Sequence, residues 1–348
     1  MKQVQTFFGN NFIFVSVITA LILTAGLVFD QPVLAMWFGF AVAAFSTVSN
    51  DSIQTLGTFL SSNRKVSWRI LWIFIGSIMV ATFYYSWLTN GGDVSYQRLE
   101  KIPQPTDFSF FQLLAPIVLI ILTRFSMPVS TTFLILATFS TTGTIEKMLS
   151  KTLIGYILAF VVALIVWSLV GYIVNKRKTK MDRNLSPREE KKWRTLQWLS
   201  TGFLWSAWLA QDAANSLVYL PREVSGWQLV AILAFMLAAL AFIFQRRGGE
   251  IQKVVTEKTD VLYVKSATMI DFVYGLILVY FKMLNNVPMS TTWVFLGLLA
   301  GREIALRATL HKDKPYSHTL KLVRKDILRA GFGLGISLAL AIMVNERF

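Results

Sequence analysis

The chain has 348 residues, of which 54% are hydrophobic and 15% are charged, and its net charge is +15. Soluble proteins carry about 25% charged residues, so this composition excludes a cytosolic enzyme or a secreted domain. It also excludes an outer-membrane barrel, whose strands would alternate apolar and polar residues over about ten positions. We predict an all-α polytopic membrane protein, with its basic residues in loops at the lipid headgroups and with no nucleic acid as a partner.

Nine apolar stretches approach or exceed the roughly 20 residues with which a helix crosses a bilayer. In chain order they are Asn11–Phe29, Val33–Thr47, Trp68–Leu88, Phe108–Leu122, Thr152–Val174, Thr195–Leu220, Trp227–Phe244, Tyr263–Phe281 and Ile327–Val344. We expect each of them to form a transmembrane helix, and the first to be a span rather than a cleaved signal peptide.

The sequence contains an internal repeat at an offset of about 160 residues, which is visible in two pairs of matching blocks. In the first pair, Asp51 and Asp212 stand at equivalent positions between amide and small residues. The second pair is Pro128–Thr132 and Pro288–Thr292, both of which read Pro-x-Ser-Thr-Thr. Two matched pairs in the same order predict a duplication.

The loop charges predict the topology, because cytoplasmic loops are rich in Lys and Arg. Segments 176–194, 246–265 and 302–325 hold nine, five and seven basic residues against three, three and two acidic ones. All three face the cytoplasm if each Pro-x-Ser-Thr-Thr segment, as a broken helix or a hairpin, makes a net crossing. The loop Thr89–Asp107, where acidic residues outnumber Arg98 and Lys101, then lies outside.

This arrangement gives about 11 crossings of the cytoplasmic membrane, with the amino terminus inside and the carboxyl terminus outside. It divides the chain into an extra N-terminal transmembrane helix (1–30), a first repeat (31–174), a basic cytoplasmic linker (175–194) and a second repeat (195–348). The two repeats have opposite orientations. Inverted repeats are typical of secondary transporters, whose site lies near the bilayer midplane. Whether the chain forms a homodimer stays open.

Asp51 and Asp212 are the first candidate site residues, because inserting a carboxylate within a span costs about 2.5–3.5 kcal/mol. Carboxylate, amide and hydroxyl oxygens without thiol or imidazole suit a hard cation. We therefore predict a sodium site, or a proton site, and no other cofactor. Its expected ligands are Asn50, Asp51, Gln54, Thr55, Gln211, Asp212 and Asn215. The alternative for each Asp is a place at a helix end in the headgroup region.

The Pro-x-Ser-Thr-Thr blocks predict an uncharged cradle for an anion, because proline begins a helix and leaves free backbone amides behind it at the positive end of the helix dipole. The expected substrate-binding residues are Ser130, Thr131, Thr132, Ser290, Thr291, Thr292, Asp51 and Asp212. The alternative is that these hydroxyls only bond back to the carbonyl four residues earlier.

Asp271 is a third carboxylate within an apolar stretch, and it has no acidic counterpart in the first repeat. A buried carboxylate needs a proton or a partner. Asp271 is therefore predicted to be a proton site, or to pair with Lys265 or Lys282 near the ends of its span.

These motifs resemble those of the inorganic phosphate transporters (PiT), whose duplicated signature reads Gly-Ala-Asn-Asp-Val-Ala-Asn-Ala-Phe-Gly-Thr and whose second element reads Pro-Val-Ser-Thr-Thr-His. The residues that match are Asn50, Asp51, Gly57, Thr58, Asp212, Ala214, Asn215, Pro128–Thr132 and Pro288–Thr292. The departures are Gln54 and Gln211 for asparagines, Val48 and Leu209 for glycines, and Phe133 and Trp293 for the histidine. The resemblance implies cation-coupled symport of an inorganic oxyanion, with Asp and Asn binding sodium and anion and Ser-Thr-Thr binding the anion.

Charge balance predicts the order of binding. A divalent oxyanion beside two carboxylates is repelled by several kcal/mol even at an effective dielectric constant of about 20, so cations must bind first. We expect symport of inorganic phosphate with sodium by alternating access, without enzymatic activity. Phosphate is preferred over sulfate because hydrogen phosphate carries a proton that a carboxylate can accept. Sulfate or another tetrahedral oxyanion, and a proton as the coupling ion, remain the alternatives.

Other classes of membrane protein fit the sequence less well. A channel would need more polar residues along its spans. An intramembrane enzyme would need a nucleophile with a base, yet the spans hold neither cysteine nor histidine. A receptor would leave the paired carboxylates unexplained.

Overall fold

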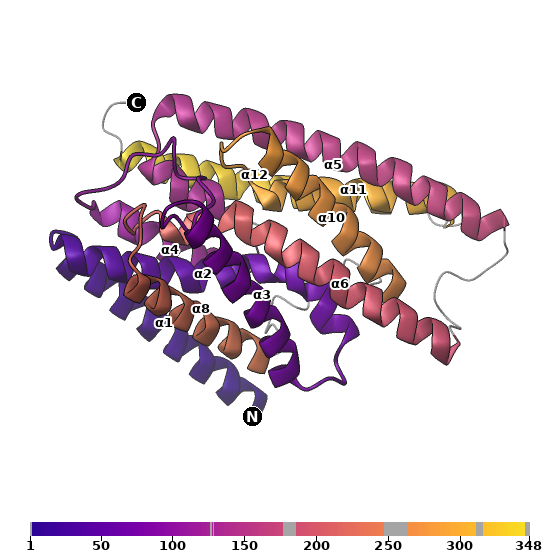
Figure 1. The fold of residues 1–348 in the computed structure, drawn as a ribbon, viewed down its shortest axis with the longest axis horizontal. Helices are drawn as coiled ribbons and strands as arrows, with labels where there is room; N and C mark the ends of the chain where they lie inside the picture. The colour runs from indigo at the N-terminus through magenta and orange to yellow at the C-terminus, as the bar shows by residue number, and fades with distance from the viewer. Residues whose placement is uncertain are drawn as a thin grey trace.

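The computed structural model describes residues 2–125, 127, 129–176, 186–246, 264–310 and 316–344. Within these residues all regular secondary structure is helical, and most of the long helices run roughly along one direction (Figure 1). Pro128 and residues 177–185 of the expected linker lie outside the described residues.

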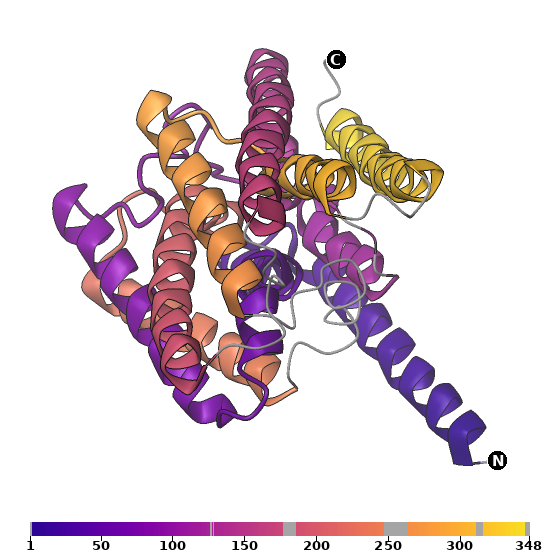
Figure 2. The ribbon, with the colours of Figure 1, turned by 90° about the vertical axis from the view of Figure 1, so that its right-hand side faces the viewer.

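The helices follow one another in two series. The first series is α1 (Lys2–Val28), α2 (Pro32–Ser62), α3 (Trp68–Thr89), α4 (Phe110–Arg124), the π-helical turn η1 (Thr132–Leu136), the 3₁₀ turn η2 (Ala137–Phe139) and α5 (Thr142–Lys176). The second is α6 (Pro187–Asp212), α7 (Ala214–Leu217), α8 (Gly226–Gln245), α10 (Val264–Leu284), α11 (Thr291–Thr309) and α12 (Tyr316–Val344). Helix α1 projects from the side of the bundle (Figure 2).

Several helices begin where local side chains satisfy their free amides. Pro32 is at the start of α2, where its missing N–H costs nothing. Ser109 precedes α4 and forms a capping box, since its hydroxyl accepts from the Gln112 N–H at 3.2 Å and its own N–H donates to Gln112 Oε1 at 2.9 Å. Ser186 and Glu189 form the same motif before α6.

Six helices of the described chain are long and apolar enough to cross a membrane, namely those within α2, α3, α5, α8, α10 and α12. Phe12–Val28 and Phe110–Arg124 are shorter apolar helices. Helix α5 leaves Ile157, Ile165 and Leu169 exposed by 55–60%, which suits contact with lipid and not with water. The expectation of a multi-pass helical membrane protein is confirmed, whereas about 11 crossings stays a prediction.

The stretch Thr195–Leu220, expected to be one helix, is interrupted at Ala213 between α6 and α7. The backbone bonds continue on both sides, because the Ala213 N–H donates to the Leu209 carbonyl and the Leu217 N–H donates to that of Ala213, both at 3.1 Å. The interruption is therefore a local loosening of the helix, and it directly follows Asp212.

The two Ser-Thr-Thr segments differ in form. After α4 the chain turns back through η1 and η2, so that Gln112 Nε2 donates to the Thr138 carbonyl at 3.0 Å. The eight residues Thr132–Phe139 cover at most about 16 Å, about half of a hydrocarbon core, so α4 with η1 and η2 forms a hairpin. In the second half, α11 is instead a continuous helix of 19 residues.

Equivalent helices of the two series run antiparallel. Between α2 and α6, Asn63 Nδ2 donates to Gln197 Oε1 at 3.2 Å, while Thr58 and Thr201 both bond to Asp271. Residue numbers at these contacts decrease along α2 while they increase along α6, so the two helices run in opposite directions. Helices α3 and α8 likewise meet head to tail, through Trp72 with Leu237 and Trp87 with Val224.

The two halves are interlocked by a close parallel contact between α5 and α11, which lie side by side in Figures 1 and 2. A methyl group added at Gly297 would lie 2.3 Å from the Tyr156 carbonyl oxygen, and one at Gly301 would lie 2.2 Å from that of Phe160. Only glycine permits this approach, as is common where membrane helices pack tightly. Helix α11 of the second half is therefore supported by α5 of the first.

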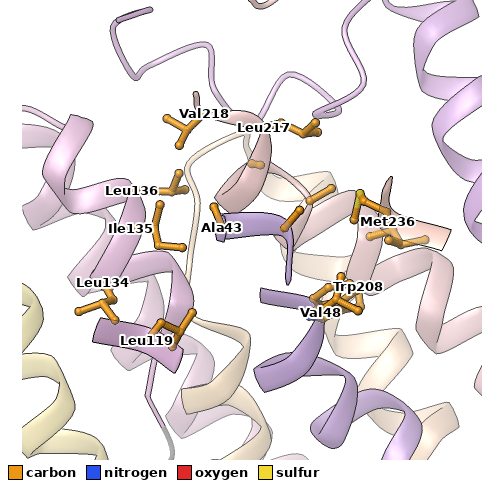
Figure 3. Packing of buried hydrophobic residues seen from close by; sticks show 14 of the residues in the cluster. Ala43, Val48, Leu119, Leu134, Ile135, Leu136, Trp208, Leu217, Val218 and Met236 are labelled. Carbon is orange, nitrogen blue, oxygen red and sulfur yellow. The ribbon is translucent and has the colours of Figure 1, made fainter. Parts of the chain in front are cut away.

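The apolar core surrounds the middle of the bundle. Figure 3 shows its packing around α2, α4, η1, α6, α7 and α8, with Val48 of α2 near Trp208 of α6, Leu134 of η1 near Leu119 of α4, and Leu136 toward Val218. A polar group in such close-packed surroundings is expensive unless it finds a partner. The polar side chains that the same segments carry therefore have to satisfy one another.

Candidate functional site

Asp51, in the middle of α2, is completely buried and receives hydrogen bonds from its own helix and from the first Ser-Thr-Thr segment. Asn50 Nδ2 donates to its Oδ1 at 2.7 Å, and the Thr131 hydroxyl donates to its Oδ2 at 2.7 Å. Asn215 Nδ2, from α7 of the second half, donates in turn to the Thr131 hydroxyl at 2.9 Å. Asp51 and Asn215 thus meet through the first Ser-Thr-Thr segment.

Asp212, at the end of α6, is also completely buried, and its environment repeats that of Asp51. The Thr291 hydroxyl donates to Asp212 Oδ2, as the equivalent Thr131 does to Asp51. The Thr132 hydroxyl, from the other half, lies 3.5 Å from Asp212 Oδ1. The two carboxylates that the repeat predicts to be equivalent therefore share one equivalent donor, the first threonine of each Ser-Thr-Thr segment, whereas Gln211, the counterpart of Asn50, donates to the Leu278 carbonyl instead.

The two Ser-Thr-Thr segments lie directly against each other through a reciprocal pair of hydrogen bonds. The Thr132 hydroxyl donates to the Met289 carbonyl, and the Thr292 hydroxyl donates to the Val129 carbonyl, both at 3.2 Å. The two bonds join equivalent positions in the two halves. This exchange is what a local two-fold relation between the repeats would produce.

The serines of the two segments have a different role from the threonines. Ser130 Oγ accepts from the Phe133 N–H at 3.2 Å, and Ser290 Oγ accepts from the Trp293 N–H at 3.3 Å. Each serine is thus bonded to an amide three residues along its own chain, as an N-cap is. The helical turns consequently start after the serine, and the hydroxyls of Thr131 and Thr291 bond to the carboxylates.

Three of the amide residues expected to bind a cation carry a buried side-chain oxygen that has no hydrogen-bond partner among the residues that the structure describes. These oxygens are Gln54 Oε1, Gln211 Oε1 and Asn215 Oδ1. The Gln54 amide nitrogen lies 3.5 Å from Asp51 Oδ1 and donates to the Thr292 hydroxyl at 3.0 Å, so its oxygen belongs to the same network. Buried acceptors without donors are rare and need a specific explanation.

The other two expected ligands already have partners. Asn50 Oδ1 accepts from the Thr123 hydroxyl at 3.1 Å. The Thr55 hydroxyl donates to the Asp51 backbone carbonyl at 3.1 Å, which is the back-bonding considered above for Ser-Thr-Thr. The unpartnered acceptors thus narrow the candidate cation ligands to the carboxylates and the amides of Gln54, Gln211 and Asn215.

Comparison with known proteins bears on the fold. No protein-family model matches the chain, and no curated protein sequence does either. Among solved structures, the chain is similar to one described as "The sodium-dependent phosphate transporter", with a TM-score of 0.58 and 14% sequence identity. The match covers 94% of this chain and 100% of the other.

The two proteins share a fold. The expectation of a fold like that of the phosphate transporters, which was based on the two pairs of motifs, is therefore confirmed. At 14% identity this likeness concerns the arrangement of the helices, and the function has to be argued from the residues of the site.

Within this transporter-like fold, Asp271 of α10 is the centre of a second buried hydrogen-bond network, separate from that of Asp51 and Asp212. It accepts from the Thr58 hydroxyl at 2.7 Å and from the Thr201 hydroxyl at 2.5 Å. The expected pairing with lysine is wrong. Lys282 donates instead to the Tyr96 carbonyl and to Asn286, and Lys265 lies over the ring of Trp193 at 5.6 Å.

The sequence prediction placed Arg98 in an outer loop without assigning it a role, and the structure shows that it is completely buried. Its Nη1 donates to the carbonyls of Asn285 and Val287, just before the second Ser-Thr-Thr segment, at 3.0 and 3.2 Å. Burial lowers the pKa of the Arg98 guanidinium to about 10, an effect that the charge of Asp212 opposes. No periodicity marks a loop residue as buried, so the sequence offered no signal for it.

Proposed function

We propose that the protein is a symporter that couples the movement of sodium to that of inorganic phosphate. The observation that carries this proposal is the convergence of Asp51 and Asp212 with the two Ser-Thr-Thr segments in one buried network. Such a network of ionisable and polar groups between membrane helices is expensive to maintain and marks a path for ions or substrate.

Sodium would bind to the carboxylates of Asp51 and Asp212 together with the unpartnered amide oxygens. Oxygen atoms of this kind suit a hard cation, and Asp212 lies directly before the interruption at Ala213, in keeping with ion sites at interrupted membrane helices. A cation at each carboxylate neutralises a charge that otherwise lies buried without an opposite charge in contact.

The anion would bind to the threonine hydroxyls. Thr131 and Thr291 now donate to the carboxylates. When a cation takes the place of these donors, the hydroxyls are free to rotate and to donate to an oxyanion at the N-terminal end of α11, where the helix dipole favours negative charge. Each hydroxyl donates one proton, so it serves either the carboxylate or the anion. This competition makes anion binding depend on prior cation binding.

Alternating access would follow from two inverted repeats that rock against each other. The antiparallel course of α2 with α6 and of α3 with α8 supports this arrangement, as do the reciprocal hydrogen bonds of Thr132 and Thr292. We further propose about 11 membrane segments, in which α4 and the η1–η2 segment are counted as the two arms of one hairpin, with the amino terminus in the cytoplasm. Labelling that puts the amino terminus and the 175–194 linker on opposite sides of the membrane would contradict this topology.

Uptake of radiolabelled phosphate into proteoliposomes tests the proposal. Uptake should require an inward sodium gradient and should stop when N-methylglucamine replaces sodium. If a proton gradient drives the same uptake without sodium, the coupling ion is a proton. Uptake that needs no gradient of either cation would contradict symport.

A sulfate transporter is the second candidate, because hydroxyls and amides donate equally well to sulfate. The two carboxylates favour phosphate, since hydrogen phosphate can donate its proton to one of them and sulfate at neutral pH cannot. Excess unlabelled phosphate should therefore suppress uptake. If excess sulfate suppresses uptake and excess phosphate does not, the substrate assignment is wrong.

A further inference from the structure

A cluster of three cationic side chains lies beside the segment that leads into the second Ser-Thr-Thr block. Arg98 comes from the loop between α3 and α4, Lys151 from α5 and Lys282 from α10. Lys151 Nζ donates to the Asn285 carbonyl at 3.1 Å and to that of Val287 at 2.8 Å, the same two carbonyls that Arg98 binds. Two positive charges therefore converge on one short segment.

The charge of this cluster is not neutralised by direct ion pairs. Among the described residues, no carboxylate forms a salt bridge with Arg98, Lys151 or Lys282. The nearby Glu100 accepts from Asn286 at 3.2 Å, and Asp93 accepts from the N–H groups of the chain that follows it. The cluster thus keeps a net positive charge within a buried region.

The guanidinium of Arg98 has one edge occupied and one edge without partners. Nη1 binds the two carbonyls, whereas Nε and Nη2 are buried and have no hydrogen-bond partner among the described residues. Nε and Nη2 together form the side of the guanidinium that donates two parallel hydrogen bonds to a carboxylate or a phosphate. A buried charged donor pair without an acceptor is costly, so its retention calls for a ligand.

We propose that Arg98 and Lys151 form an oxyanion-binding site on the outer side of the transport site. This outer site binds phosphate first, and phosphate moves on to the threonine hydroxyls of the transport site after sodium has bound there. This inference rests on the proposed function. Arg98 lies in the loop that we expect to face outside, and it is close enough to Asp212 to feel its charge. The Nε–Nη2 edge binds two oxygens of the anion, and Lys151 adds a second positive charge.

Arg222 provides a matched control, because it is an outer-loop arginine whose guanidinium is occupied. It donates to the carbonyls of Val218, Leu220, Ile102 and Pro103. Burial lowers its pKa to about 10, as for Arg98. A lysine at either position keeps the charge but loses the planar fork. The difference in phosphate binding between Arg98→Lys and Arg222→Lys therefore measures the contribution of the unpartnered Nε–Nη2 edge of Arg98.

The test is the binding of inorganic phosphate to the purified full-length protein in sodium-free buffer, measured by calorimetry beside thermal unfolding. The outer site should bind phosphate without sodium, since it contains no carboxylate to be neutralised first. Arg98→Lys should weaken this binding about tenfold or more through the loss of one bidentate contact, and Arg222→Lys should leave it unchanged. If Arg98→Lys does not fold, Lys151→Gln must show the same loss.

Two results overturn the inference: no sodium-free phosphate binding by the wild-type protein, or binding that the Arg98 and Lys151 variants leave intact. Its failure is distinguishable from that of the proposed function. Sodium-driven phosphate uptake without sodium-free binding rejects the outer site alone. Sodium-free binding that depends on Arg98, in a protein without sodium-driven uptake, supports the outer site and rejects the symport.

Discussion

Asp51 and Asp212 on one side, and Asp271 on the other, are equally buried but differ in what surrounds them. Both oxygens of Asp271 accept a short hydrogen bond from a threonine of α2 or α6. The central pair lies instead beside amides whose oxygens have no donor in the described part of the chain. Burial of a carboxylate therefore does not identify a cation site by itself, whereas a carboxylate with surplus acceptors nearby does.

Replacement of either central carboxylate should have the largest effect. In Asp51→Asn or Asp212→Asn the amide retains the shape of the side chain but cannot neutralise a cation, so sodium-driven phosphate uptake should be abolished. The measurement is uptake into proteoliposomes, with size-exclusion chromatography to show that the variants are folded. Asp107→Asn, at an exposed loop position, is the control. Full uptake by either variant would remove that carboxylate from the coupling mechanism.

Removal of an unpartnered amide oxygen should have the next largest effect. Gln54→Leu should raise the sodium concentration for half-maximal uptake by about tenfold, the equivalent of about 1.4 kcal/mol for one lost ligand. Uptake at saturating sodium should be largely retained. Gln104→Leu, in an exposed loop, should leave the sodium dependence unchanged. A Gln54 variant with normal sodium dependence would mean that the surplus acceptor is not a ligand.

Asp271→Asn tests whether the carboxylate outside the central pair is structural and does not bind the cation. The amide can still accept a hydrogen bond, but its NH₂ group cannot accept from the second threonine, so the stability should fall by about 1–3 kcal/mol. The sodium dependence of uptake should stay the same. Thermal unfolding and a sodium titration measure the two effects separately. A shift in sodium dependence like that of Gln54→Leu would place Asp271 in the cation path.

The smallest effect is expected at the serines. Ser290→Ala removes an N-cap and should lower the stability by about 1 kcal/mol, with the KM for phosphate unchanged. Thr291→Val, which removes the donor to Asp212, should instead impair transport as well as lower the stability by about 1–3 kcal/mol. If Ser290→Ala raises the KM as much as Thr291→Val does, the serine hydroxyl binds substrate as first expected.

The sequence was sufficient to predict the paired carboxylates and the paired Ser-Thr-Thr blocks, because a duplication makes polar residues within apolar stretches recognisable. It did not separate the serines from the threonines. The starting point of each helix depends on which hydroxyl accepts the third amide, and three adjacent hydroxyl residues leave that choice to the packing around them. The burial of Arg98 could not be predicted, since the loop folds inward only against Asn285 and Val287, nearly 190 positions away.

The difference between the two Ser-Thr-Thr segments was also beyond the sequence. Both follow the same pattern, yet η1 is a short π-helical turn and α11 a continuous helix. Gly297 and Gly301 allow α11 to pack closely along α5, whereas η1 and η2 end at Phe139 and Ser140 is extended. The tertiary contact available to each segment decides its length.

Movement of radioactive sodium driven by phosphate tests the central claim most directly. Proteoliposomes without an initial sodium gradient are given an inward phosphate gradient, and the uptake of ²²Na⁺ is followed. Obligatory coupling predicts that phosphate drives sodium inward, that omission of phosphate stops this movement, and that Asp51→Asn and Asp212→Asn abolish it. Phosphate uptake without accompanying sodium would contradict the account.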